Sequence, residues 1–158
     1  MRASLLFLKT MLVLLALPAL AFCLFIIPGM ASRDAAAHPE TAYLQYPFML
    51  SAYLLFSLFF IALYQVFKLL GSISRNQAFS MDSVSALKKI KYCAFAIALC
   101  FIAGLVFLIV FIGGDIAGIF TMSLICILAS STVCAFAATL EKLTILAIQL
   151  KEENKLTV

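Results

Sequence analysis

The feature that most constrains this chain is the length of its apolar runs, which carry almost no charge. The first contains no charged residue from Met11 to Ile27 and forms an apolar segment over residues 5–27. A helix needs about 20 such residues to cross about 30 Å of hydrocarbon. The other apolar runs lie at residues 48–70, 92–112 and 116–140. The sequence therefore predicts an all-α membrane protein with four transmembrane helices in one integral membrane domain, residues 1–158.

The composition indicates the same class of protein. Apolar residues make up 66% of the 158 residues, charged residues only 11%, and the mean hydropathy is +1.19. These values lie far outside those of a soluble domain. Four spans with short connections leave no room for a sizeable soluble domain, so we expect an antiparallel, up-down four-helix bundle.

The first apolar segment has a rival interpretation as a cleaved signal peptide. Arg2 and Lys9 precede an apolar run in which residues 19–21, ALA, have the small-x-small form of a cleavage site. The apolar sequence continues past that site as FCLFII, which a signal peptide does not need. The pattern favours a retained span, with Pro18 as a candidate kink and Pro28-Gly29 as the end of the helix.

The connection between the first two spans, residues 28–46, is expected to be a solvated loop. It contains the only histidine, His38, with Asp34 and Glu40 nearby. One histidine and two scattered carboxylates lack the number and spacing of ligands found in specific metal sites. We therefore expect no metal and no other cofactor.

The segment from Ser74 to Tyr92 separates the second and third spans and carries much of the positive charge. Ser80 is placed to cap a helix that begins at Met81, and Asp82 would lie near the positive end of its dipole. No proline or glycine separates this helix from the next apolar run. The third helix should therefore extend out of the membrane without a break.

The fourth span is followed by residues 141–154, which keep a helical pattern. Leucines and alanines line one side of this segment, whereas Glu141, Lys142 and Glu152 lie on the other. The fourth helix is therefore expected to continue as a helical tail outside the membrane.

Basic residues are distributed very unevenly around the four predicted spans. Loops on the cytoplasmic side of membrane proteins are rich in lysine and arginine. With four spans, Arg33 alone lies on one side. The basic residues on the opposite side are Arg2, Lys9, Lys68, Arg75, Lys88, Lys89, Lys91, Lys142, Lys151 and Lys155. Both termini and both helical extensions are therefore expected to be cytoplasmic, in a bacterial cytoplasmic membrane.

Small residues recur at every fourth position on the third and fourth spans, a pattern that lets helix backbones approach closely. These positions are Ala96, Cys100 and Gly104 on the third span, and Cys126, Ser130, Cys134 and Ala138 on the fourth. The short connection Gly113-Gly114-Asp115 predicts that the two helices are neighbours. All five cysteines fall within predicted spans without a CxxC pattern, so we expect packing residues and not disulfides or metal ligands.

The segment before the third span resembles part of a known family. Ala78-Phe79-Ser80, Ser83-Val84 and Leu87-Lys88-Lys89-Ile90 are similar to the phrase PFSxxNVxxLKKI. That phrase precedes the third span in the domain-of-unknown-function family DUF2975, which comprises small bacterial four-span membrane proteins. Ser83 stands where the family has asparagine, and Ala78 where it has proline.

The end of the chain, residues 152–158, is similar to the ending EENDLTI of the same family, with Lys155 in place of the aspartate. The family has no established activity, and its genes often neighbour small helix-turn-helix regulators. The resemblance therefore implies at most a regulatory or sequestering role, with such a regulator as a protein partner.

No motif in the chain indicates a reaction. There is no nucleophile with a base, no phosphate-binding glycine loop and no carboxylate pair, so we expect a protein that is not an enzyme. The predicted membrane interior also lacks an acid, a base or a histidine, which argues against an ion-coupled carrier.

The leading hypothesis is a regulatory or scaffolding membrane protein whose cytoplasmic face contacts a protein partner or lipid headgroups. The residues expected on that face are Arg75, Ser80, Asp82, Lys88, Lys89, Lys91, Glu152, Glu153 and Asn154. No direct binding of nucleic acid is expected, and a homo-oligomer is left open. The alternative is a transporter of small molecules or amphiphiles, or an immunity-type resistance protein, that uses Ser130, Ser131 and Thr132 in the bundle interior.

Overall fold

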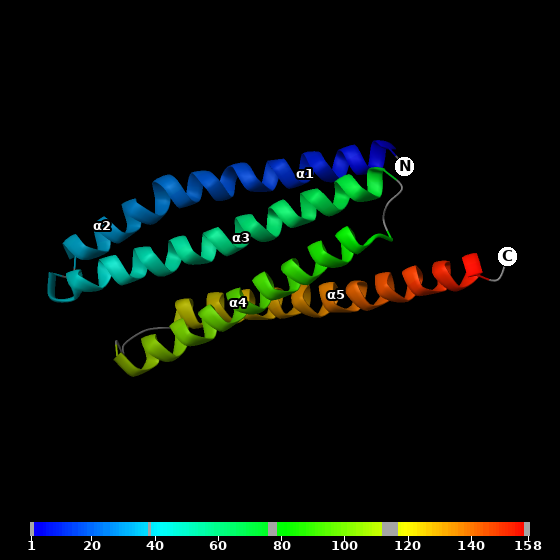
Figure 1. Cartoon of the computed structure of the whole chain (residues 1–158). Helices are drawn as coiled ribbons and strands as arrows, with labels where there is room; N and C mark the ends of the chain where they lie inside the picture. The colour runs from blue at the N-terminus through cyan, green and yellow to red at the C-terminus, as the bar shows by residue number, and fades with distance from the viewer. Residues whose placement is uncertain (1, 38, 76–78, 112–116, 157–158) are drawn as a thin grey trace.

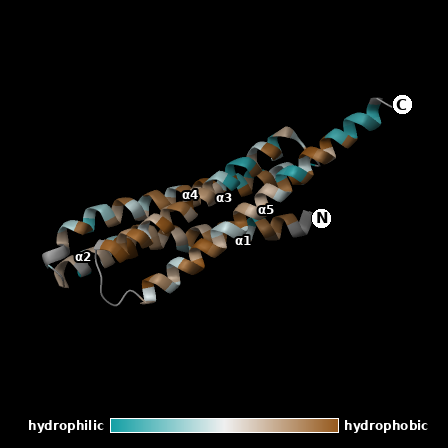
Figure 2. Cartoon of the chain, turned by 90° about the horizontal axis from the view of Figure 1, so that it is seen from below, coloured by the Kyte–Doolittle hydropathy of each residue, from teal (hydrophilic) through white to brown (hydrophobic). Residues whose placement is uncertain are grey.

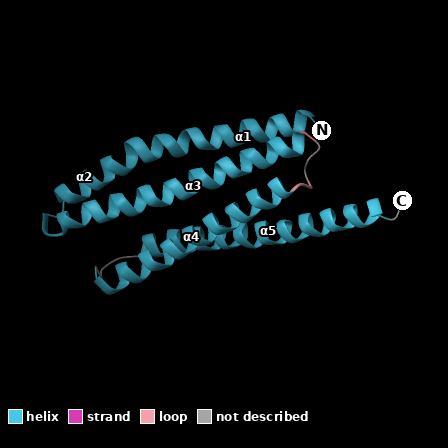
Figure 3. Cartoon of the chain, viewed as in Figure 1, coloured by secondary structure: helices cyan, strands magenta, loops and turns pink. Residues whose placement is uncertain are grey.

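A computed structural model describes residues 2–37, 39–75, 79–111 and 117–156 of the chain. All regular structure in these ranges is helical (Figure 3). The elements are α1 (Arg2–Ala21), a π-helical turn η1 (Phe22–Ile26), α2 (Ile27–Ala37), a 3-10 helix η2 (Pro39–Leu44), α3 (Gln45–Ser74), α4 (Met81–Phe111) and α5 (Ala117–Leu156).

Four stretches of helix are long and apolar enough to cross a membrane. They are Leu5–Ala37, Ala42–Ser74, Met81–Val110 and Ala117–Lys155. In the most apolar window of each stretch, no more than 11% of the residues are buried inside the protein. So much exposed apolar surface needs hydrocarbon around it instead of water. The predicted class, an all-α protein with four membrane-spanning helices, is confirmed.

The four spans run alternately in opposite directions (Figure 1). The start of α1, the end of α3, the start of α4 and the end of α5 therefore lie together at one end of the bundle. We call this the charged end and define it as residues 2–9, 68–75, 79–91 and 141–156. Figure 2 shows hydrophilic segments gathered toward the C-terminal end of the molecule, with hydrophobic segments along the length of the helices.

The main contacts between the long helices follow chain order: α1 packs on α3, α3 on α4, and α4 on α5. The seam between α4 and α5 is the most extensive. The prediction that the third and fourth spans are neighbours is confirmed. The connection Gly113-Gly114-Asp115, and the predicted span ends at residues 112 and 116, lie outside the described residues.

The interior of α4 and α5 consists mainly of small side chains. The buried residues on these two helices are Ser83, Ala86, Leu87, Ile90, Cys93, Ala94, Ala98, Ser123, Ala137 and Thr144. Small residues let backbones approach closely, and close packing is the main attraction between helices in lipid.

The predicted stripe on α4 is offset from the buried one. Ala94 and Ala98 are buried, whereas Cys100 is half-buried and Gly104 is exposed. A Cβ added at Gly104 would meet nothing within 4 Å. Small residues occur on both sides of α4, so spacing alone could not show which side faces α5. On α5, the predicted positions Cys126, Ser130 and Cys134 are half-buried.

The expectation that Pro28-Gly29 ends the first helix is wrong, because α2 continues the helical path to Ala37. Proline has no N–H, and its ring clashes with the carbonyl four residues earlier, here that of Leu24. The wider π-helical turn directly before Pro28, in which the Ile27 N–H donates to the Phe22 carbonyl, provides room for the ring. Figure 1 shows the bend between α1 and α2 at this turn.

Most of residues 28–46 is helical, so the expectation of a solvated loop there is also wrong. The alanine-rich sequence ASRDAAA within α2 has high helix propensity and no glycine, which lets the helix persist. The 3-10 helix η2 follows, and α3 begins at Gln45 instead of Phe48. At its other end α3 runs past residue 70, the end of the predicted span, because Gly71 to Ser74 form its last turn.

The packed interior of α4 should tolerate no larger side chain. Ala98→Leu adds three carbons at a position that is only 8% exposed, and it should destabilise the protein by about 1–3 kcal/mol. Ala103→Leu, on the exposed side of the same helix, is the control and should leave stability unchanged. Thermal unfolding in detergent micelles measures both. An equal loss of stability in the two variants would contradict the assignment of Ala98 to the packed interior of the bundle.

Candidate functional site

The connection between α3 and α4 is organised by Ser80. The Ser83 N–H donates to the Ser80 Oγ at 3.3 Å, and the N–H groups of Ser83 and Val84 donate to the Ser80 carbonyl at 3.0 and 3.2 Å. Met81 begins α4, and Asp82 is exposed in its first turn. The predictions that Ser80 caps this helix and that α4 starts at Met81 and runs without a break are confirmed.

Ser83 is the most completely buried side chain among the described residues, at 1% exposed, and its Oγ lies 3.3 Å from the Oγ of Ser80. The hydroxyl thus joins the cap from inside the bundle. Ser83 therefore lies in the packed interior of the charged end. Ala78, the other substituted position of the phrase before α4, lies outside the described residues.

A small apolar hollow of about 160 Å³ lies where three helices meet at the charged end. Phe79 and Leu87 line it together with residues of α3 and α5. The full lining is Leu69, Ile73, Phe79, Leu87, Leu140 and Thr144. Phe79 and Leu87 both belong to the family-like phrase, so this part of the phrase connects α3 and α4 to the start of the α5 extension.

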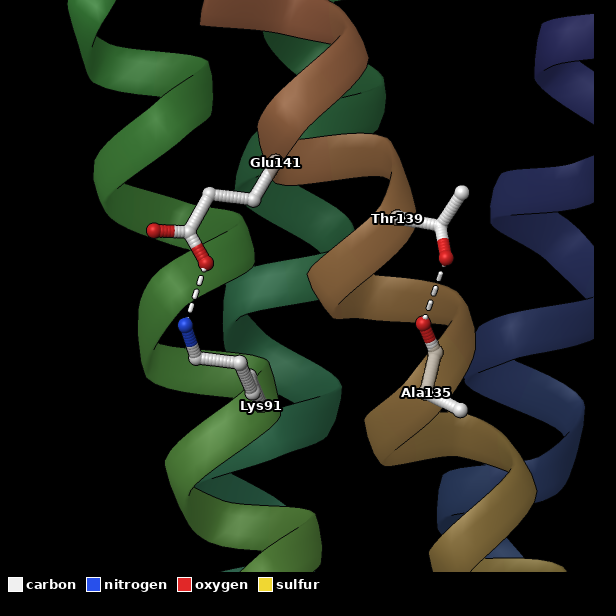
Figure 4. Close-up of polar contacts among 4 residues, drawn as sticks. All are labelled: Lys91, Ala135, Thr139 and Glu141. Carbon is white, nitrogen blue, oxygen red and sulfur yellow. Dashed lines mark hydrogen bonds and ion pairs between the residues drawn. The ribbon is translucent and has the colours of Figure 1, made fainter.

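Lys91 and Glu141 form an ion pair between α4 and α5, with the Lys91 Nζ donating to the Glu141 Oε2 at 2.5 Å (Figure 4). Their side chains are 26% and 14% exposed. Sequence reasoning placed Lys91 on the partner-binding face, and the structure instead directs it toward a neighbouring helix. The two residues are 50 positions apart, and only the register of α4 against α5 could have identified the pair.

The other basic residues expected on the contact face point away from the bundle. Arg75 ends α3, where its N–H donates to the Ser72 carbonyl at 3.2 Å, and its side chain is exposed. Lys88 and Lys89 are exposed on α4. The structure therefore brings these three cations to the surface of the charged end. Their role in binding stays a prediction.

Helix α5 continues without a break from Ala117 to Leu156 and extends past the start of α4 (Figure 1). Glu152, Glu153 and Asn154 are exposed on this extension. Leu143, Leu146 and Leu150 share one side of it and are 55%, 54% and 65% exposed. The apolar side of the extension therefore faces outward, which the sequence pattern alone did not show.

The chain compares clearly with known proteins. A model of the family DUF2975, described as "Protein of unknown function", matches residues 29–158. The chain belongs to this family. It is also 45% identical over 158 residues to the "Uncharacterized membrane protein YoaS" of Bacillus subtilis (strain 168), and the match covers 99% of both chains. No solved structure matches the chain. The resemblance to DUF2975 inferred from residues 78–90 and from the chain ending is confirmed.

The transporter hypothesis places three hydroxyl groups in the bundle interior, but in this DUF2975 member none of the three residues is fully buried. Ser131 and Thr132 are exposed on α5, and Ser130 is half-buried. The Thr132 Oγ1 donates to the Leu128 carbonyl of its own helix at 2.8 Å. Thr139 does the same with the Ala135 carbonyl at 2.9 Å (Figure 4). The hydroxyls of Thr132 and Thr139 are thus held by the backbone of their own helix.

Metal-ligating side chains are dispersed over the part of the chain that the structure describes. No group of three or more His, Cys, Asp or Glu residues there could hold a metal ion. His38 lies outside the described residues. The five cysteines are free thiols, with Cys23 and Cys93 buried and the other three half-buried.

The Lys91–Glu141 pair should couple the stability of α4 and α5. Lys91→Met or Glu141→Leu alone leaves one half-buried charge without its partner, so each should lower the unfolding temperature. The double variant replaces both charges by apolar side chains and should regain most of the loss. Lys88→Met, at an exposed position, is the control. Thermal unfolding of all four variants tests the pair, and losses that simply add would show that the two residues do not interact.

Proposed function

We propose that this DUF2975 protein is a non-catalytic, multi-pass protein of the bacterial cytoplasmic membrane that binds a protein partner through its charged end. Its role would be regulatory or scaffolding. The observation that carries the proposal is the row of exposed leucines, Leu143, Leu146 and Leu150, on the last part of α5, which follows its long apolar stretch.

The length of α5 supports this position for the leucines. Its 40 residues extend for about 60 Å at about 1.5 Å per residue, roughly twice the thickness of the hydrocarbon layer. The apolar part of α5, residues 117–140, is long enough to cross that layer by itself. Residues 141–156 then lie in the headgroup region and in water, where a row of exposed leucines favours contact with a protein.

The surroundings of the leucines also suit a protein interface. Lys142, Lys151 and Glu152 are exposed beside them. An apolar strip with charged residues of both signs at its margin is typical of the centre and rim of an interface. An amphipathic helix that presents such a strip commonly binds in the groove of another protein.

The orientation is proposed from the basic residues. Arg75, Lys88 and Lys89 are exposed at the charged end, and Arg33 alone is at the opposite end. Such an excess favours the cytoplasmic side. A cytoplasmic partner, for which the family resemblance suggests a small helix-turn-helix regulator, could then reach both α5 and the Ser80 turn.

A non-catalytic role is supported by the hydrogen bonds and the ion pair that carboxylate and hydroxyl side chains form within the protein. Glu141 is paired with Lys91. The described hydroxyls of Thr10, Thr121 and Thr144 donate to carbonyls of their own helices. An activated nucleophile needs a neighbouring base within hydrogen-bond distance, and these hydroxyls are held by the backbone instead.

Labelling with a membrane-impermeant thiol reagent tests the orientation. In intact cells, Ala36→Cys at the far end should react, whereas Gln149→Cys at the charged end should react only after the cells are opened. Both positions are exposed, and the unmodified protein measures the background from its own cysteines. The opposite pattern would place the charged end outside the cell and would contradict the proposed orientation.

Photo-crosslinking in native membranes tests the partner. A photoreactive amino acid at Leu150 should yield one protein adduct of defined mass, identified by mass spectrometry. The matched position is Ile125, which is 56% exposed in the middle of α5 and should yield lipid adducts. Leu146→Asp should abolish the adduct formed from position 150, because it places a charge inside the interface. If position 150 yields no protein adduct, or the same adducts as position 125, the proposed function is wrong.

A further inference from the structure

α1 and α3 each carry a lysine near a contact that joins the two helices at the charged end. The Lys9 Nζ lies 5.5 Å from the ring centroid of Phe67, so a cation of α1 rests over an aromatic ring of α3. Such a contact is attractive because of the negative charge on the face of the ring. Lys68 follows Phe67 directly, and its side chain is exposed. The neighbouring helices α1 and α3 therefore each carry a lysine at or directly beside this contact.

Both lysines lie at a similar depth inside the bundle. Lys9 is about 10 Å from the start of α1 at Arg2, and Lys68 is about 9 Å from the end of α3 at Ser74, at a rise of about 1.5 Å per residue. Lysines in this position extend their side chains toward the headgroups. The two ammonium groups therefore belong to the layer in which lipid phosphates lie.

Neither lysine can find a carboxylate on its own helix at this end. Residues 1–33 and 41–81 contain no aspartate or glutamate. Glu141 is the carboxylate nearest the membrane boundary on α5, and it is already paired with Lys91. The positive charges of Lys9 and Lys68 thus have no carboxylate beside them on α1 or α3 at the charged end.

We infer that Lys9 and Lys68 bind the phosphate of an anionic phospholipid at the α1/α3 seam. The phosphodiester would supply the missing counterion, and each ammonium group can donate to its oxygens. Tyr64 lies one turn before Lys68 on the same side of α3 and is 65% exposed. Its ring would contact the lipid below the headgroup, as Val13, 51% exposed and one turn deeper than Lys9 on α1, would also do.

The site differs from general attraction of basic residues to a membrane. Lys88 and Lys89 are exposed on α4, with Asp82 on the same helix and Lys91 already paired. A general attraction depends on the number of charges near the surface. A site at the seam depends on which lysines are present, and two double variants of equal charge can separate these cases.

The test is native mass spectrometry of the purified full chain titrated with phosphatidylglycerol. Lys9→Gln/Lys68→Gln should weaken lipid binding roughly tenfold or more, whereas Lys88→Gln/Lys89→Gln should change it by less than about threefold. Lys9→Arg/Lys68→Arg keeps both charges and should retain binding. Circular dichroism and thermal unfolding confirm that each variant is folded. Phosphatidylcholine, which has no net charge, should bind more weakly to the unmodified protein.

Three outcomes would overturn the inference. Equal weakening by the two glutamine variants would show general electrostatic attraction only. Equal binding of phosphatidylglycerol and phosphatidylcholine would show that the negative charge of the headgroup is not recognised. Displacement of the lipid by millimolar inorganic phosphate would show that the lysines take a free anion instead of a lipid headgroup.

Discussion

The structure depends on a single constraint, which is that the solvent around most of the protein is hydrocarbon. Side chains such as Phe25 and Phe136, 77% and 67% exposed, would be unfavourable in water but are well solvated by lipid. Under this constraint, burial of apolar side chains no longer drives the helices together, because lipid solvates them equally well. The backbone must also satisfy its own hydrogen bonds, which only helices and closed barrels achieve in a bilayer.

What remains to hold the bundle together is close contact between backbones. The interior of the bundle meets this need with the buried residues Ala94, Ala98 and Ala137 of α4 and α5. The seam between these two helices is the most extensive among the described residues. Two polar contacts lie at the charged end, the Ser80 cap of α4 and the ion pair between α4 and α5. The Ser80 cap and the Lys91–Glu141 pair set where α4 begins and how it is rotated against α5. The orientation of α5 determines in turn that Leu143, Leu146 and Leu150 face outward.

The parts of this structure that the sequence predicted are those controlled by local chemistry. Four apolar runs gave the four spans, because the thickness of hydrocarbon sets a minimum length for each. Ser80 was recognised as a cap from its residue type and the helix that follows it. Pro28-Gly29 misled, because a π-helical turn accommodates a proline that would otherwise end the helix. The alanine-rich segment after it then had no reason to stop being helical.

The parts that could not be predicted depend on how one helix faces another. Small residues lie all around α4, so spacing could not show that Ala98 and not Gly104 meets a neighbour. The register that joins Lys91 to Glu141, and the Lys9–Phe67 contact, also arise only once the helices are placed together. The charge pattern could therefore locate the candidate contact face. It could not show that the leucines of α5 are exposed there, or that Lys91 is paired within the bundle.

The order of the helix contacts bears on how the protein is made. The main seams join α1 to α3, α3 to α4 and α4 to α5, so each span packs on the one before it in the chain. A chain that enters the membrane from its N-terminus would provide each new span with its neighbour already in place. Contacts between neighbours along the chain close only short loops, which favours rapid folding. Assembly of the bundle can thus proceed during synthesis, with one seam formed as each new span is added.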